Sequence, residues 1–226
     1  MSSQLSLLAL LLSAVMATGG GAQTPALVGH YKAAWMGDSG TEEQDVQFSA
    51  DGSYRWENTY TGDLNAYAQA ALAPGTILPV DLGKGVVHVV FQGTWSAQDT
   101  LLTTTGTTTE FTVDGTPLAT YLTTLGTTTS AQMVQQLGVT GADAEALIAQ
   151  VQRQFEVLGQ LAVQRIYTLN VIEAQPFSFV NPYPGSFPEH DLYVSYQPGW
   201  YLLYDRVDSS SAISGTTWAQ VKAARR

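Results

Sequence analysis

A serine flanked by acidic and small residues is the first feature of this sequence that could do chemistry. The segment Gly-Asp-Ser-Gly occupies residues 37–40. A serine nucleophile needs a histidine base and an acid that orients it. Only His30 precedes Ser39, and the position three residues before His190 is Phe187 rather than an aspartate. We therefore interpret 37–40 as a turn and expect no catalytic residue there.

The other chemically capable groups are acidic residues and three histidines. Residues 38–45 (DSGTEEQD) carry four carboxylates but lack the alternating spacing of a Ca²⁺-binding loop. His30, His88 and His190 share no motif, and the chain has no cysteine. Glu189-His190-Asp191 stands in a proline-rich loop, where a solvated cluster is the simplest interpretation. We predict no metal site and no cofactor, and an enzyme is the less favoured class.

Composition limits the classes of partner. The 226-residue chain has a formal net charge of −10, from nineteen acidic and nine basic residues. Binding to a phosphate backbone needs clustered Lys and Arg, so we expect no nucleic-acid partner. Charged residues make up only 12% of the chain, with Thr, Ser, Gln and Gly supplying the remaining polarity. This composition is typical of secreted β-proteins.

The first 22 residues resemble a signal peptide. An apolar stretch from Leu5 to Ala17 is too short to span a bilayer, which needs about 20 residues. Small residues follow it and suggest cleavage near Ala22, although no Lys or Arg precedes the stretch. We expect export to the periplasm or the extracellular space, with no transmembrane span in the mature chain. Whether the segment is cleaved or retained stays open.

The elements that must position any site are mostly strands. Apolar residues alternate on both sides of Asp51-Gly52, which predicts a β-hairpin. A short helix is expected near residues 64–73, within the connection 61–84. We predict one β-domain over 27–208, followed by a Ser-rich linker and a basic tail at 209–226.

Two threonine tracts are the most unusual feature of the chain. Thr is β-branched and favours strands, and neither tract contains a proline that would suggest a glycosylated stalk. We interpret residues 99–113 as a strand, a bend at Gly106 and a second strand. The tract within 121–130 is expected to end a strand or loop and lead to a helix at Ser130.

A helical period interrupts the strands at about residues 130–160. This predicts an inserted helical hairpin, followed by a strand at 163–174. Its apolar stripe is expected to pack on the barrel or, alternatively, to bind a protein partner. The stripe includes Leu147, Val151, Phe155 and Leu158.

Four segments resemble the bacterial secreted lipocalin-like domains: GHYKAAW, VQFSADGSYRWE, GTWSAQDTLLTTT and WYLLYDRV. The resemblance implies an antiparallel β-barrel or strongly curved sheet. It also implies a structural floor in which an opening aromatic residue, Tyr31 or Trp35, packs beneath Arg206. Two departures are Tyr31, where the family carries Trp, and the helical insertion.

Two functions follow from this fold. The first is a non-enzymatic binding protein that holds a small apolar or amphipathic ligand in the barrel. The alternative is an accessory subunit of a cell-surface or membrane-associated assembly, with a side-chain-filled barrel and the hairpin or basic tail as its contact. Candidate ligand-binding residues for the first function are His88, Phe179, Tyr183, Phe187 and Trp200.

Overall fold

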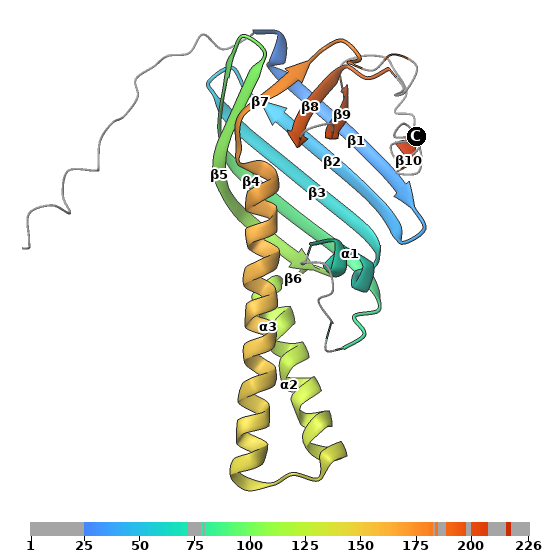
Figure 1. The fold of residues 1–226 in the computed structure, drawn as a ribbon, viewed down its shortest axis with the longest axis vertical. Helices are drawn as coiled ribbons and strands as arrows, with labels where there is room; N and C mark the ends of the chain where they lie inside the picture. Colours follow the sequence, from blue (N-terminus) through green and yellow to red (C-terminus); the bar gives the residue numbers. More distant parts are fainter. Residues whose placement is uncertain are drawn as a thin grey trace, which may run out of the picture.

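The protein is an antiparallel β-barrel from which a long helical hairpin projects (Figure 1). This computed structural model describes residues 25–71, 78, 80–182, 184, 189–197, 200–207 and 216–217. The expected mainly β barrel is confirmed. The predicted signal peptide and most of the C-terminal tail lie outside the described residues. The strands are β1 (Gly29–Gly37), β2 (Gly40–Phe48), β3 (Ser53–Asp63), β4 (Lys84–Gln98), β5 (Leu101–Val113), β6 (Thr116–Pro117), β7 (Ile172–Ser178), β8 (Leu192–Gln197), β9 (Trp200–Arg206) and β10 (Thr216–Thr217).

Eight of the described strands close the barrel in the order β1-β2-β3-β4-β5-β7-β8-β9, and β9 returns to β1. The pairings from β1 to β5 are long, whereas the β1–β9 seam consists of Tyr31 opposite Arg206 and Lys32 opposite Asp205. The short β10 adds a parallel edge to β1, opposite Trp35 and Met36. The barrel is therefore held by long strand pairings from β1 to β5 and closed by a seam of two residue pairs between β1 and β9.

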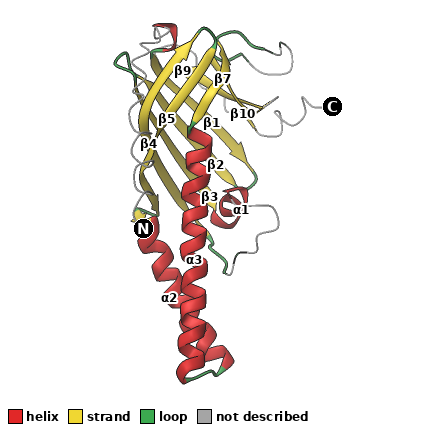
Figure 2. Ribbon diagram, turned by 60° about the vertical axis from the view of Figure 1, so that its left-hand side comes forward, coloured by secondary structure: helices red, strands yellow, loops and turns green. Residues whose placement is uncertain are grey.

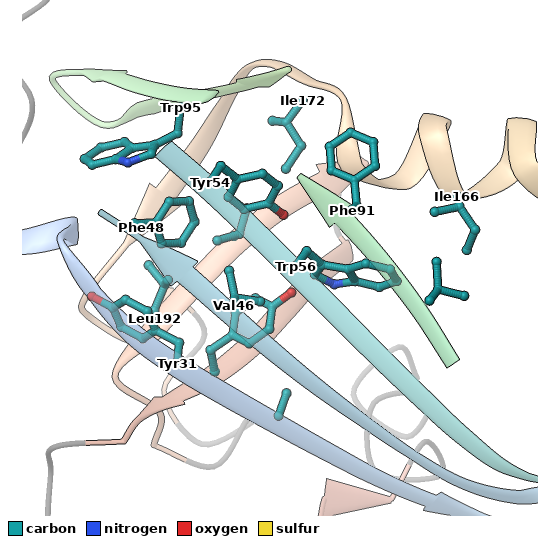
Figure 3. Close-up of a cluster of buried hydrophobic side chains, with 14 of the residues drawn as sticks. Tyr31, Val46, Phe48, Tyr54, Trp56, Phe91, Trp95, Ile166, Ile172 and Leu192 are labelled. Carbon is teal, nitrogen blue, oxygen red and sulfur yellow. The ribbon is translucent and has the colours of Figure 1, made fainter. Parts of the chain in front are cut away.

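Alternation of side chains builds the interior. Along β3, Tyr54, Trp56, Asn58 and Tyr60 are buried, while their neighbours face outward. Inward-facing aromatic rings from adjacent strands pack on one another, with Phe48 5.3 Å from Tyr54 and 5.4 Å from Trp95 between ring centroids (Figure 3). Such pairs stabilise a core beyond the area they bury.

Sharp turns join the strands where the sequence predicts them. Asp51-Gly52 connects β2 to β3, with Gly52 at a φ of 84°, which confirms the predicted hairpin. Asp38 and Ser39 form the turn between β1 and β2, so the Gly-Asp-Ser-Gly segment is a hairpin connection. The short helix expected after β3 is α1 (Leu64–Ala71).

The two threonine tracts adopt different structures. The first lies in one continuous strand, β5, rather than in two strands about a bend. It stays continuous because Gly106 lies opposite Gly93 in β4, and a Cβ on Gly93 would come within 1.7 Å of the Thr105 carbonyl oxygen. Two glycines thus let the backbones of β4 and β5 approach closely.

The second tract is helical, and the expectation of a strand or loop there is wrong. It lies within α2 (Leu118–Leu137), where the hydroxyls of Thr123, Thr124 and Thr127 donate to carbonyls four residues earlier. The weak helix propensity of Thr is overcome by packing against α3 (Gly141–Asn170). Gly126 of α2 lies against Phe155, and Gly159 of α3 lies against Leu122, so small residues let the two helices meet.

The helical hairpin is consequently longer than predicted, spanning 118–170 instead of about 130–160. Residues 163–170, expected to begin a strand, are the last two turns of α3. Helical spacing places Phe155, Gly159, Ile166 and Asn170 on the buried side, an arrangement that an alternating strand would break. At 30 residues, α3 is about 45 Å long and reaches far beyond the barrel (Figure 2).

Candidate functional site

A cavity of about 200 Å³ lies inside the barrel, between the sheet and the last turns of α3. Its wall is largely apolar and aromatic, with contributions from Phe48, Trp56, Leu102 and Ile166. Glu42, Gln44, Asn58 and Arg165 are among the polar side chains that also reach it. Ligand sites in proteins commonly combine an apolar wall with a few such polar groups.

Gln44 is the centre of a polar network at this cavity. Its Oε1 accepts a hydrogen bond from Trp56 Nε1 (3.3 Å) and another from the Tyr204 hydroxyl (3.0 Å). Its Nε2 donates to Glu42 Oε1 at 3.2 Å. Gln44 is only 9% exposed, so these bonds satisfy a buried amide and join β2, β3 and β9 across the barrel.

Glu42 and Asn58 leave two acceptor atoms unused. Asn58 Nδ2 donates to Glu42 Oε1 at 3.0 Å, so that oxygen accepts two bonds. In the described part of the chain, nothing donates to Glu42 Oε2, and the buried Asn58 Oδ1 has no partner. Rotating the amide would place its oxygen against the Glu42 carboxylate, so the orientation of Asn58 is fixed. The cavity therefore offers acceptors and lacks donors at this point.

Burial makes the charge on Glu42 unfavourable. Desolvation raises the pKa of the Glu42 carboxyl, and the hydrogen bonds from Gln44 and Asn58 oppose this effect. Burial also raises the pKa of Tyr204, and it raises that of Tyr67, where the nearby Glu42 adds to the effect. Both phenols thus stay neutral, and Glu42 is the titrating acid of the cavity wall.

Glu42 shares the lining of two hollows with aromatic residues. It lines the main cavity with Trp56 and Tyr67, and it also borders a second hollow of about 190 Å³ with Trp35 and Tyr60. Tyr60 and Tyr67 lie 4.8 Å apart between ring centroids. Glu42 therefore borders two hollows that aromatic residues also line.

The end of α3 forms a fixed wall of the cavity. The Tyr54 hydroxyl donates to Asn170 Oδ1 at 3.2 Å, and the Thr104 hydroxyl donates to the Asn170 carbonyl oxygen. The Ile172 amide in turn donates to Thr104 Oγ1 at 3.1 Å. Arg165, one turn earlier in α3, is the cationic side chain of the cavity lining, and it forms no ion pair with another described residue.

The comparisons find no relative for this chain: no family model, curated protein or solved structure matches it. The lipocalin-like resemblance therefore stays a prediction. Among the described residues, no helix is long and apolar enough to cross a membrane. The described residues also contain no group of three or more His, Asp or Glu side chains arranged to hold a metal ion.

Of the predicted ligand-binding residues, His88 and Phe179 have described side chains, and neither lines this cavity. His88 lies on the outer face of β4, because Val87 and Val89 on either side of it face the core. Its Nδ1 is 3.3 Å from Thr59 Oγ1, and its Nε2 is 3.7 Å from Glu57 Oε1. Phe179 is 39% exposed and packs edge-on against Phe177.

The side chains of the remaining three candidates lie outside the described residues. Tyr183 and Phe187 lie outside the described residues. Trp200 begins β9, but its side chain is also outside the described part. Binding roles for these three residues stay predictions.

The residues named for the structural floor lie near the β1–β9 seam. The Arg206 guanidinium carbon is 5.7 Å from the centroid of the Tyr31 ring, and Arg206 Nη2 donates to the Val28 carbonyl oxygen at 2.5 Å. Tyr31 is therefore the aromatic residue beneath Arg206, while Trp35 lies further along β1, beside the hollow that Glu42 borders.

Sequence reasoning missed the polar residues that face inward. Residues 42, 44, 46 and 48 share one face of β2, so the alternation that identifies Val46 and Phe48 as core also points Glu42 and Gln44 inward. His190 was expected in a solvated cluster, but its side chain is 5% exposed and its Nδ1 is 2.9 Å from Asp205 Oδ1. Pairing with a strand residue draws the loop histidine inside.

Most of the apolar stripe of the hairpin packs against other parts of the same chain. Val151 and Phe155 are buried, and Phe155 and Leu158 border a small apolar cavity of about 80 Å³ that Phe111 and Leu118 also line. Leu147 is half-buried. The stripe thus packs on α2 and on one face of the barrel.

Proposed function

We propose that this protein is a non-enzymatic binding protein that holds a small amphipathic molecule in the barrel cavity. The observation that carries the proposal is the pair of unused acceptors, Glu42 Oε2 and the buried Asn58 Oδ1, on residues that line a largely apolar and aromatic cavity. A buried acceptor without a partner is unfavourable in an empty site. A ligand that supplies donors at one end and apolar surface at the other would satisfy both.

The size of the cavity limits the ligand. At about 200 Å³ it is smaller than the roughly 300–1,000 Å³ of sites for drug-sized molecules. We expect a molecule with one ring or a short branched chain rather than a fatty acid or a large cofactor.

Native mass spectrometry of the protein purified gently from its own host tests the proposal. We expect an additional mass of at most a few hundred daltons, lost on denaturation, which fragmentation would identify. Leu169→Trp, which fills the cavity from α3, should abolish this additional mass. Thr168→Trp, the same change on the exposed neighbour, should retain it. A bare mass for the unmodified protein would contradict the proposal.

The accessory-subunit function has one observation in its favour. The hairpin projects beyond the barrel, and α2 carries no charged side chain over its 20 residues. Leu137 and Val157 are 62% and 47% exposed. Co-purification of a stoichiometric protein partner, lost on replacing Leu137 and Val157 with Ser, would support this function.

Export is part of the proposal. The apolar stretch at 5–17 and the small residues before Gln23 support a leader that is removed near Ala22. The N-terminal mass of the mature protein tests it, and a retained Met1 would contradict cleavage.

A further inference from the structure

Glu42 is unlike the other acidic residues of the chain in its surroundings. Its neighbour Glu43 is exposed on the outer face of β2, and Glu57 on β3 pairs with Arg55. Glu42 faces inward and lines one hollow with Trp56 and Tyr67 and a second hollow with Trp35 and Tyr60. In the described structure no cation neutralises it.

The hydrogen bonds around Glu42 orient it for a further donor. Gln44 and Asn58 both donate to Oε1, which fixes the carboxylate plane and leaves Oε2 open. Asn58 Oδ1, on the same side chain that donates to Glu42, is a second acceptor without a partner, and it is buried. Gln44 Oε1 is already used by Trp56 and Tyr204, so among the described side chains of this polar network the unused acceptors belong to Glu42 and Asn58.

An organic ammonium group meets these requirements. It carries N–H donors for both acceptors and a charge that compensates the buried carboxylate, and nearby aromatic rings attract a cation. A hydroxyl has only one donor and no charge. The net charge of −10 also concentrates cations around the protein.

We infer that the ligand of the barrel is a small primary amine with an apolar body, whose ammonium group binds Glu42 and Asn58. This inference rests on the proposed binding function and names its ligand class. Arg165 reaches the same cavity from α3, on the helix wall, and is half-buried with access to solvent.

Three probes that differ only in their polar end test the ligand class: 2-phenylethylamine, 2-phenylethanol and 3-phenylpropanoate. Titration calorimetry on the intact protein should show that the amine binds with an affinity about tenfold above that of the alcohol. A hydrogen bond to a charged group is worth roughly this factor. Glu42→Gln should remove the preference, and Glu43→Gln should leave all three affinities unchanged.

Glu42→Asp provides a second variant that keeps the charge and shortens its reach. It should weaken the amine by several-fold while preserving the rank order of the probes. Equal binding of amine and alcohol, unaffected by Glu42→Gln, would overturn the inference and leave the proposed function standing. Tightest binding of the carboxylate, lost in Arg165→Gln, would also overturn it. Failure of all three probes, with no mass adduct on the native protein, would overturn both.

Discussion

Adjacent residues of one strand can have opposite roles, and Glu42 and Glu43 illustrate this. Both are glutamates in β2, but alternation sends the first into the barrel and the second into solvent. Burial raises the pKa of the inward-facing Glu42, because its carboxyl loses hydration. Two adjacent glutamates therefore provide one candidate binding group, Glu42, and one ordinary surface charge, Glu43.

The raised pKa of Glu42 predicts how its replacement affects stability. The folded state holds the Glu42 proton more tightly than the unfolded chain, whose carboxyl has the ordinary pKa of 4.5. Stability from this group is therefore lost as pH rises from 4.5 through the raised value. The Glu42→Gln variant has no carboxyl at this position and should not lose this stability. The difference in free energy of unfolding between the variant and the unmodified protein should therefore shift in favour of the variant as pH rises, and then level off.

Urea unfolding between about pH 4 and pH 8 measures this difference. Glu43→Gln, at the exposed neighbouring position, is the control and should follow the unmodified protein throughout. Parallel curves for Glu42→Gln and the unmodified protein would mean that burial does not shift the Glu42 pKa.

Close packing at Gly29 predicts a second effect at this scale. A Cβ there would lie 2.9 Å from Arg206 Nη2, so Gly29→Ala should displace the guanidinium from the Tyr31 ring and the Val28 carbonyl. We expect a loss of roughly 1–2 kcal/mol in the free energy of unfolding. Gly37→Ala, in the same strand with no atom near the added carbon, should change it by less than about 0.5 kcal/mol.

At the scale of elements, local pattern predicts the barrel strands well and the hairpin poorly. Alternation on both sides of the Asp51-Gly52 turn identifies the β2–β3 hairpin, because each strand has one buried face, whereas β5 is predicted as two strands about a bend at Gly106. The threonines of 123–129 give no such signal; their helix depends on Gly126 and Gly159 bringing α2 against α3. Gly126 meets Phe155, 29 positions later, and Gly159 meets Leu122, 37 positions earlier, so a local window does not detect these contacts.

The candidate site, too, could be predicted from the sequence only in part. The inward direction of Glu42 and Gln44 could be predicted from the period of β2. Their connection to Asn58 and Tyr204 could not, because it depends on the register between β2 and β3 and on closure by β9. The aromatic loop residues proposed from composition lie elsewhere or outside the described chain.

Thr104 joins the barrel to the hairpin and predicts a measurable difference within one threonine tract. It is fully buried, donates to the Asn170 carbonyl and accepts from the Ile172 amide. Thr104→Val keeps the shape but leaves both backbone groups unpaired, so we expect a loss of roughly 2–4 kcal/mol.

Thr105→Val is the matched control, because Thr105 is exposed and bonds only to Thr94 across the strand pair. Chemical denaturation should show a change of less than about 0.5 kcal/mol for this variant. Similar losses at the two positions would mean that Thr104 does not hold the helix–strand junction.

For the whole molecule, α3 has two parts with separate tasks. Its last turns carry Arg165, Ile166 and Asn170 into the barrel wall, whereas its first turns contact only α2 beyond the barrel (Figure 2). The barrel core contains Ile166 but no residue from the outer half of the hairpin. The cavity and the outer hairpin should therefore be separable.

Shortening the hairpin tests this separation. Gly126 lies against Phe155 and Gln152, so replacing residues 131–149 with a short Gly-Asn connection would join facing positions of the two helices. We expect the shortened protein to fold, because the buried strand residues Val89 and Phe91 keep all their core neighbours. Their amides should remain among the slowest to exchange with deuterium, since β4 pairs along its length with β3 and β5.

Probe affinities at the cavity should stay within about twofold of those of the full chain, a difference of less than about 0.5 kcal/mol. Fast exchange throughout β4 would instead make the outer hairpin part of the barrel's folding unit, and weakened probe binding with β4 intact would couple the tip to the cavity through α3.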